Sequence, residues 1–401
     1  MGLFKEVKKP AIRAASTGAE VSSKRPSYVA KQAPCAAKCP MGNNVRDWLV
    51  PLAQHEAYGR SPAEALATAW RQITEINPFP AICGLLCQHA CEAACNRKAK
   101  EGAVGINLLE RCIGDFGVAH GLQLPATAVA RSEAVAIVGA GPGGLACAFY
   151  LARRGYRVSL FEAAPRLGGM LRYGIPRSVL PAAVLDCEIA RIVQLGVDYR
   201  CDCVVGQDVP LDELAHGYQA VFFALGLLKP AQLQPVAKPD GVLWIGELPE
   251  GTPPPRQEAA EVSPRVNNSV SLAIAQGLEA GASLARHFNG EAAESKPKAA
   301  VIEAARMKLA WYPALEAQHG SVVEVPGEAP RPALSEAEAI AEARRCMSCG
   351  SCMDCESCWM YCTPNCIVRL PKGEHYKLKL DSCNGCGKCY ETCPCGYIEM
   401  N

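Results

Sequence analysis

Two runs of cysteines near the C-terminus have the spacing by which proteins hold iron–sulfur clusters. Each run reads Cys-x2-Cys-x2-Cys-x3-Cys, and a proline follows within two residues. In this pattern three thiolates of one run bind a [4Fe–4S] cubane, and the last cysteine of the other run is the fourth ligand. The sequence therefore predicts two cubanes, one on Cys352, Cys355, Cys358 and Cys393 and one on Cys383, Cys386, Cys389 and Cys362.

Zinc is the alternative metal that these cysteines could bind. Zinc sites usually combine separate Cys-x2-Cys pairs, so eight cysteines in ferredoxin order favour clusters. Four more cysteines lie in the same region. They could bind a further metal, or they could be thiols without a metal, packed or free: Cys346, Cys349, Cys366 and Cys395.

A second cysteine block lies between residues 35 and 95. Cys35-x3-Cys39 is followed by Pro40, and further along the chain the spacing is Cys83-x3-Cys87-x3-Cys91-x3-Cys95. Such spacing places cysteines on successive helical turns or in a tight loop. We expect a third cubane on Cys39, Cys87, Cys91 and Cys95, whereas Cys35 and Cys83 cannot form another all-cysteine cubane alone. The alternative is that all six are structural thiols.

A glycine-rich turn follows an apolar strand predicted at residues 134–138. It reads Gly139-Ala-Gly141-Pro142-Gly143-Gly144 and opens a helix that Gly155 closes. In this pattern the first glycine makes the turn, the second lets the backbone approach a pyrophosphate, and the third allows close helix–strand packing. Glu162 ends the next predicted strand, where a carboxylate holds a ribose hydroxyl. The sequence therefore predicts a dinucleotide site, with an empty glycine turn as the alternative.

The segment after this site favours FAD over a nicotinamide. Arg166, Gly168, Gly169 and Met170 follow directly and are expected to line the same site. No histidine or aspartate stands out as a hydride-transfer partner for a small alcohol. Several clusters beside one dinucleotide indicate a flavin, because a flavin takes electrons in pairs and gives them singly.

The composition excludes several classes of protein. The chain has 401 residues, a net charge of +1 and 49% hydrophobic residues, so there is no electrostatic reason to expect nucleic acid or a charged membrane surface as a partner. Its 23 cysteines in metal-binding spacings indicate a reducing compartment. The first ten residues lack the apolar core of a secretory signal, so we expect a cytoplasmic location. The uncharged run 134–152 contains glycines and a proline, which favours strand–turn–helix over a membrane span.

The order of predicted elements indicates a multidomain α + α/β fold. It comprises an N-terminal helical Fe–S domain, one Rossmann-like FAD domain and a C-terminal bacterial ferredoxin-like domain. Strands are expected at 156–162, 220–226 and 241–246, and helices at 271–288 and, after the Ser335–Glu338 capping box, at 335–345. The expected boundaries are a flexible basic tail at 1–31, the helical domain at 32–125, the FAD domain at 132–290, a linker at 291–334 and the ferredoxin-like domain at 335–401.

The stretches GAGPGGLACAFYLARRGYRVSLFE (139–162) and RLGGMLRYGIPRSVLP (166–181), after a cysteine block, carry a resemblance to a known family. The chain resembles the small (beta) subunit of NADPH-dependent glutamate synthase and its relatives over roughly residues 35–290. These relatives include the N-terminal part of dihydropyrimidine dehydrogenase and the large subunit of NADH-dependent ferredoxin:NADP oxidoreductase. The resemblance implies FAD in the first Rossmann domain and Fe–S clusters in the helical domain. The block RCMSCGSCMDCESCWMYC resembles ferredoxin domains attached to some relatives and the delta subunits of 2-oxoacid:ferredoxin oxidoreductases.

Three departures from this family bear on function. A second Rossmann domain for NADPH, of roughly 100 residues, has no room in the segment KPAQLQPVAKPD (229–240), and the sequence has no second Gly-x-Gly-x-x-Gly. The family's Gly-Asp near the flavin ribityl chain stands here as Gly246-Glu247, which we expect to contact FAD. The first cysteine segment holds only Cys35 and Cys39, so we expect one family cluster to be lost.

The missing nicotinamide domain indicates an electron-transfer subunit that relays electrons between FAD, [4Fe–4S] clusters and a partner oxidoreductase. Expected partners are a 2-oxoacid:ferredoxin oxidoreductase or a molybdenum, tungsten or siroheme enzyme, without nucleic acid or direct membrane insertion. One alternative is an NAD(P)H-dependent oxidoreductase that uses a nicotinamide site of another subunit. The other is a non-catalytic scaffold that docks a ferredoxin module.

Overall fold

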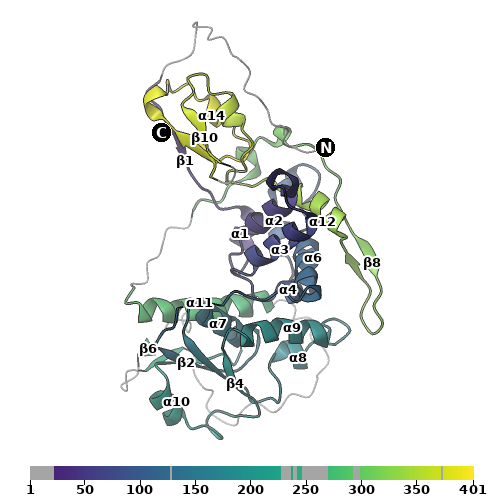
Figure 1. The fold of residues 1–401 in the computed structure, drawn as a ribbon, viewed down its shortest axis with the longest axis vertical. Coiled ribbons are helices and arrows are strands. Elements are labelled where there is room, and N and C mark those ends of the chain that lie inside the picture. Colours follow the sequence, from purple (N-terminus) through teal and green to yellow (C-terminus); the bar gives the residue numbers. More distant parts are fainter. Residues whose placement is uncertain are drawn as a thin grey trace.

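The computed structural model describes residues 22–126, 129–226, 236–237, 242–245, 270–291, 299–371 and 374–401. Most of the predicted tail and the two predicted contacts Gly246 and Glu247 lie outside these residues. Figure 1 shows three parts along the long axis: a cysteine-rich module, a helical domain in the middle and an α/β domain. The predicted multidomain fold is confirmed.

The helical domain is built from short helices whose apolar faces share one core. These helices are α1 (Pro34–Lys38), α2 (Val45–Ala53), α3 (Pro62–Ile73), α4 (Pro80–Leu86), α5 (Ala90–Ala93) and α6 (Ile106–Ala119). Short 3-10 turns follow α2 at His55–Tyr58 and α5 at Asn96–Ala99. Trp48 of α2 and Trp70 of α3 are both buried in this core.

Helix α12 (Glu336–Ala343) also packs on the helical domain, although the sequence analysis assigned it to the C-terminal domain. It contacts α2, α3 and α6. The predicted capping box is present, because Ser335 accepts the N–H of Glu338 and the Glu338 carboxylate accepts the N–H of Ser335. The apolar face of the helix, with Ala339 and Ala343 fully buried, is the physical reason for this docking.

The segment predicted as a linker is ordered where the structure describes it, from residue 299 onward. It contains 3-10 turns at Ala304–Arg306 and Leu309–Trp311 and a hairpin of β8 (Ser321–Val323) and β9 (Arg331–Ala333). Its backbone is held by charged side chains: the Pro313 carbonyl accepts from Arg97, and the Gln318 N–H donates to Glu342. These polar contacts were not visible in a sequence rich in Pro, Ala and Glu.

The C-terminal module pairs with the other end of the chain. Its elements are α13 (Ser357–Met360), β10 (Ile367–Arg369), β11 (Tyr376–Leu378), a 3-10 turn at Leu380–Ser382, α14 (Lys388–Thr392) and β12 (Ile398–Met400). Strand β12 pairs antiparallel with β1 (Pro26–Tyr28), and Lys31 forms an ion pair of 2.8 Å with Glu399. Residues 26–31 therefore belong to this module, which corrects their prediction as a flexible tail.

The α/β domain contains a six-stranded sheet in the order β4-β3-β2-β5-β7-β6. The strands are β2 (Ala134–Val138), β3 (Arg157–Phe161), β4 (Asp198–Arg200), β5 (Ala220–Phe223), β6 (Val236–Ala237) and β7 (Leu243–Ile245). All neighbours are parallel except β6 and β7. The helices are α7 (Pro142–Ala152), α8 (Met170–Tyr173), α9 (Ala182–Val193), α10 (Leu211–Gly217) and α11 (Val270–Phe288). The predicted strand–turn–helix at 134–152 is confirmed. None of the helices in the described part of the chain is both long and apolar enough to cross a membrane.

Helix α11 lies against α7, the helix that follows the glycine turn (Figure 1). A Cβ at Gly277 of α11 would lie 1.9 Å from the carbonyl oxygen of Gly143 in α7. Only glycine permits this approach, so α11 is held close to the glycine turn. The N-terminal end of α11 also reaches the helical domain, since Ser271 lines a cavity there.

Glu188, on α9, joins the α/β domain to the helical domain. Its carboxylate accepts the N–H groups of Ala81 and Ile82 at 2.9 and 3.1 Å. These are N–H groups of the first turn of α4, a helix without a side-chain cap of its own. Arg191 is also buried, 3.8 Å from Glu188, with its guanidinium over the Trp70 ring. Burial raises the pKa of Glu188 to about 8, and the two domains are joined by the hydrogen bonds that this carboxyl group accepts from α4.

Replacing Glu188 by alanine should lower the free energy of unfolding by about 2–6 kcal/mol, because the buried N–H groups of Ala81 and Ile82 would each lose their acceptor. Urea denaturation measures this change. The exposed Glu213, on α10, is the matched control, and its alanine variant should stay within about 0.5 kcal/mol of the parent. Equal small changes for both variants would show that Glu188 does not hold the domains together.

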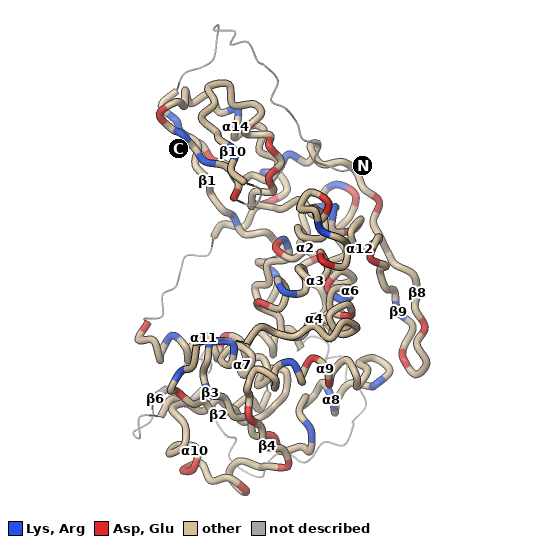
Figure 2. Tube along the Cα trace, in the orientation of Figure 1, with Lys and Arg blue, Asp and Glu red and all other residues tan. Residues whose placement is uncertain are grey.

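Charges are distributed over the whole molecule. Figure 2 shows acidic and basic residues interspersed along all three parts. This distribution along the chain agrees with the net charge of +1.

Candidate cofactor sites

The glycine turn has the geometry of a nucleotide-binding loop. Gly139 has φ +99°, and its N–H donates to the Phe161 carbonyl at 2.7 Å. A Cβ at Gly144 would lie 1.9 Å from the Gly139 oxygen, whereas a Cβ at Gly141 would meet only the Gly169 Cα at 4.0 Å. Helix α7 begins at Pro142 without a side-chain cap, so its first N–H groups are open to an anionic group. The loop is tight at Gly139 and Gly144 and open at Gly141, as a bound pyrophosphate requires.

Glu162 lies beside this turn, as predicted. Its two carboxylate oxygens accept the N–H groups of Ala140 and Ala164 at 2.8 and 2.9 Å. Each carboxylate oxygen can accept a second hydrogen bond. The side chain is therefore oriented by the backbone and keeps the capacity to accept from ribose hydroxyls.

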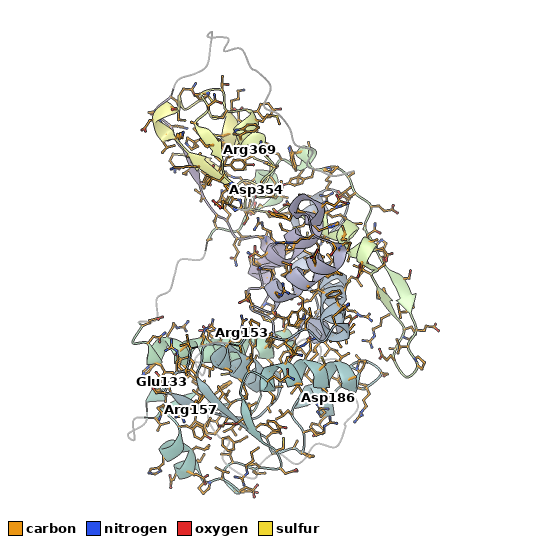
Figure 3. All side chains as sticks on the ribbon, viewed as in Figure 1. Glu133, Arg153, Arg157, Asp186, Asp354 and Arg369 are labelled. Atoms are coloured by element: carbon orange, nitrogen blue, oxygen red, sulfur yellow. The ribbon has the colours of Figure 1, made fainter. Side chains whose placement is uncertain are left out.

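The segment 166–170 folds over the glycine turn. Gly169 has φ +48°, and a Cβ there would lie 2.7 Å from the Gly141 Cα. The Gly168 N–H donates to the Ala140 carbonyl. Arg166, by contrast, forms a hydrogen-bonded ion pair with Asp186 at the surface, which Figure 3 labels near α9. The structure thus brings the glycines of this segment to the site, and Asp186 holds the Arg166 guanidinium.

Three of the four N-terminal cysteines predicted as ligands meet in one cavity. Cys39, Cys87 and Cys91 line a cavity of about 160 Å³ at the edge of the helical domain. Cys95 does not line it, which differs from the sequence expectation. The carboxyl group of Glu110, on α6, also lines this cavity. Cys83 is fully buried and points its thiol toward Asn77 at 3.7 Å.

Burial and the nearby carboxyl of Glu110 raise the pKa of the Cys39, Cys87 and Cys91 thiols in the first cavity. Burial raises the pKa of Glu110 to about 7, and Asn77 donates to its Oε1 at 2.9 Å. Burial raises the pKa of the Cys87 thiol, while hydrogen bonds from the His89 N–H and the Ser271 hydroxyl lower it. Ser271 belongs to α11 of the α/β domain. The wall of the cavity is therefore shared by the helical domain and the dinucleotide domain.

A second cavity adjoins the first and brings together cysteines from both blocks. Its wall includes Cys35 and Cys95 of the helical domain and Cys346 and Cys349 from the segment after α12. The sequence analysis left Cys35, Cys346 and Cys349 without an assignment. The spacing Cys346-x2-Cys349 was a signal, but nothing in the sequence indicated which distant cysteines it would face.

The two C-terminal cysteine runs form loops of the same shape. In the first run Asp354 and Glu356 have φ +55° and +62°, and in the second Gly385 and Gly387 have φ +73° and +74°. These residues flank the middle cysteine of each Cys-x2-Cys-x2-Cys loop. The two loops therefore share a left-handed backbone on both sides of the middle cysteine, as two loops with the same ligand spacing would.

The thiols group as the ferredoxin pattern predicts. After burial, the neighbouring charges that most raise the pKa of Cys358 are those of Cys355, Cys352 and Cys393. Burial and the charges of Cys362, Cys386 and Cys383 raise the pKa of Cys389 to about 11. Each loop therefore faces the last cysteine of the other run. Cys366 and Cys395 lie beside these sets, their sulfurs 3.2 Å from Cys362 and 3.8 Å from Cys393.

His375 supports the first of these loops. Its Nδ1 lies 2.7 Å from Oδ1 of Asp354, which also lies 3.6 Å from the Cys352 sulfur. Figure 3 labels Asp354. The three side chains are close enough to hold a metal ion of their own. Cys352 has only one thiolate, however, and its loop presents two further thiols, so the cubane accounts for more of the cysteines.

Comparison with known proteins finds that parts of the chain are similar to subunits of oxidoreductases. Residues 3–122 match the family model of the 4Fe–4S domain II of dihydropyrimidine dehydrogenase, and residues 137–188 match an NAD(P)-binding Rossmann-like domain. The chain is homologous to glutamate synthase small-chain-like proteins and carries their Fe–S domain and Rossmann-like domain.

Particular relatives come from several bacteria. The beta subunit of NADPH-Fe(3+) oxidoreductase from Geobacter sulfurreducens is 36% identical over 48% of this chain and 28% of its own length. A subunit of NAD-dependent dihydropyrimidine dehydrogenase from Salmonella typhimurium is 36% identical over 49% of this chain and 46% of its own length. The small chain of glutamate synthase [NADPH] from Escherichia coli is 35% identical over 48% and 39%. The chain thus spans less than half the length of these relatives.

The solved structures that match this chain cover part of it. FprA from Mycobacterium tuberculosis in complex with NADPH matches 24% of this chain and 23% of its own length at 25% identity, with a TM-score of 0.23. A similarity at this level does not extend to the arrangement of the domains.

Proposed function

We propose that this protein is an electron-transfer subunit of a larger oxidoreductase, with FAD and [4Fe–4S] clusters as its redox groups. The observation that carries the proposal is that buried thiols converge beside a dinucleotide loop. Ser271 of α11 lies on the wall of the first thiol cavity, and α11 packs on α7, which begins at the glycine turn. Cofactors in these two sites would be neighbours within one rigid packing of helices.

The glycine turn would hold the pyrophosphate of FAD. A flavin supplies the exchange between two-electron and one-electron chemistry. The N–H groups at the start of α7 would bind the phosphates, the open side of Gly141 would admit them, and Glu162 would accept from the ribose. FAD is preferred over a nicotinamide because several one-electron carriers surround a single dinucleotide site.

The first thiol cavity would hold a cubane through Cys39, Cys87, Cys91 and Glu110. Glu110 replaces Cys95 of the sequence expectation, because Glu110 lines the cavity and Cys95 does not. Iron also binds carboxylate oxygens, as in the two-histidine, one-carboxylate sites of non-haem iron proteins, and burial of the site keeps water from competing. The C-terminal loops would hold two further cubanes with the ligands predicted from the sequence.

Electrons would enter and leave through partner proteins. Strands β5 and β7 are adjacent in the sheet, with Ala220 opposite Leu243, and the segment between them is too short for a nicotinamide domain. A 2-oxoacid:ferredoxin oxidoreductase or a metal-cofactor reductase is a suitable partner class. The second candidate function, NAD(P)H oxidation at a nicotinamide site of another subunit, is favoured by the relatives named as NADPH- or NAD-dependent. The many thiols favour a cytoplasmic location, where they stay reduced.

Cofactor content tests this proposal. Anaerobically purified protein should contain about one FAD and at least about twelve irons per chain, since each cubane has four. Protein that holds iron but no flavin would instead support the scaffold alternative. Protein with neither group after reconstitution with iron, sulfide and FAD would contradict the proposal.

A further inference from the structure

The second thiol cavity has the features of a complete cluster site. Its four cysteines come in pairs from opposite ends of the chain: Cys35 and Cys95 from the helical domain, Cys346 and Cys349 from the segment after α12. We propose that Cys35, Cys95, Cys346 and Cys349 hold a fourth [4Fe–4S] cluster, which joins the helical domain to the C-terminal module. This inference rests on the proposed function and extends it to a site that the cysteine spacing alone did not predict.

The four thiols are close neighbours electrostatically. Burial, together with the charges of Cys346 and Cys95, raises the pKa of Cys35 to about 12. Burial also raises the pKa of Cys349, with added contributions from Cys346, Cys35 and Cys95. Each pair thus faces the other across the cavity. The four half-buried sulfurs line one cavity, as the four ligands of one cubane would.

The backbone around Cys349 repeats the shape of the two ferredoxin loops. Ser348 and Gly350, which flank Cys349, have φ +49° and +75°, like the residues that flank Cys355 and Cys386. The Cys346 sulfur accepts the N–H of the residue two positions later, Ser348. The same hydrogen bond joins Gly385 to Cys383 at 3.4 Å. The segment is therefore already folded as a ligand loop.

A buried polar network fixes this loop on the helical domain. Arg345, directly before Cys346, is fully buried and forms an ion pair of 2.5 Å with Glu342. Its guanidinium also donates to the carbonyls of Gly102 and Ala103 at 2.9 and 2.8 Å. Arg97 donates to the Arg345 carbonyl at 3.1 Å. Such a network determines where Cys346 lies relative to Cys95.

The wall of the cavity suits an anionic cluster. Arg46 and Arg97 line it, and both guanidinium groups lower the pKa of Cys346, although burial raises that pKa more strongly. Nε of Arg46 is buried without a hydrogen-bond partner among the described residues. A cluster sulfur would provide an acceptor and a negative charge. The apolar side chains Leu49 and Val104 complete the wall and exclude water.

The position of the site connects the other clusters. Val45 and Ile106 line both thiol cavities, so a single layer of side chains separates them. On the other side, Cys349 and Cys352 are three residues apart, so their Cα atoms are at most about 11 Å apart. Tyr312 is buried here, and its OH donates to the Met347 carbonyl at 2.8 Å. The fourth cluster would therefore lie between the first cavity and the ferredoxin loops.

Iron counting and spectroscopy of the full chain test this assignment. The anaerobically reconstituted protein should contain about sixteen irons, four for each of four cubanes, rather than about twelve. Cys346→Ala and Cys35→Ala should each lose about four irons and the same signal in electron paramagnetic resonance spectra of the dithionite-reduced protein, while flavin content is retained. Cys112→Ala is the matched control, because this half-buried thiol on α6 lines neither cavity.

The outcomes separate this inference from the proposed function. Full loading at about twelve irons, or one zinc per chain that Cys346→Ala removes without loss of iron, would overturn the fourth cluster and leave the relay intact. Loss of flavin and of all clusters in the parent protein would instead contradict the proposed function. If Cys346→Ala unfolds, the iron count of the parent and the Cys35→Ala variant still decide.

Discussion

Replacing Cys362 by alanine should lower the iron content by about four atoms per chain, whereas replacing Cys366 should leave it unchanged. The two sulfurs are only 3.2 Å apart and both residues are buried. Cys362 and Cys366 are therefore similarly buried, and only Cys362 is expected to bind iron. Loss of this cubane should also abolish electron transfer to an external ferredoxin-type acceptor, because the C-terminal module would lose one of its two carriers.

Iron analysis and reduced-state electron paramagnetic resonance spectra measure both effects. The flavin should remain bound in both variants, since the glycine turn lies in a different domain. If Cys366→Ala lost the irons and Cys362→Ala kept them, Cys366 would be the ligand. The ferredoxin order of the run would then not apply to this chain.

Replacing Gly141 by alanine should weaken FAD binding by about ten- to a hundredfold with little change in stability. The added methyl group meets only the Gly169 Cα at 4.0 Å, so the empty loop tolerates it. A bound pyrophosphate would lose close approach to the backbone, and a hydrogen bond to a charged group contributes about 1.5–3 kcal/mol. Equilibrium dialysis of the apoprotein with FAD measures the loss.

Gly144→Ala is the informative comparison for this variant. Its Cβ would lie 1.9 Å from the Gly139 carbonyl oxygen, so the turn must shift, at a cost of about 1–3 kcal/mol in stability. The two variants should thus separate binding from folding. Unchanged FAD affinity in Gly141→Ala would show that the flavin does not approach this turn.

The features that the sequence predicted well depend on short-range patterns. The glycine turn, the capping box at Ser335 and the two ferredoxin loops each involve residues within about ten positions of one another, and all three have the expected geometry. Local spacing determines local shape, and these predictions needed nothing more.

The features that the sequence did not predict depend on contacts between distant segments. Cys95 was assigned by spacing to the cluster of Cys87 and Cys91, but it faces Cys346, which lies some 250 positions later, in the second cavity. The buried pair of Arg345 and Glu342 brings that segment to the helical domain. A pairing of this kind is set by tertiary packing and has no signature in residue spacing.

The domain boundaries differ for the same reason. Residues 26–31 were predicted to be part of a charged tail, because a strand of three residues, β1, cannot be recognised in the sequence without its partner β12. Helix α12 read as part of the ferredoxin module because it precedes the cysteines in sequence. The apolar face of α12, however, packs against the larger core of the helical domain at α2 and α6.

The most direct test of the relay is an anaerobic titration of the flavin- and iron-loaded chain, followed in the visible spectrum. NADPH and NADH are added first and dithionite second. The account predicts no bleaching by either nucleotide, and bleaching of the flavin and cluster absorbance by dithionite. Rapid bleaching by a nucleotide would contradict it, because the chain would then contain a nicotinamide site and would oxidise NAD(P)H by itself.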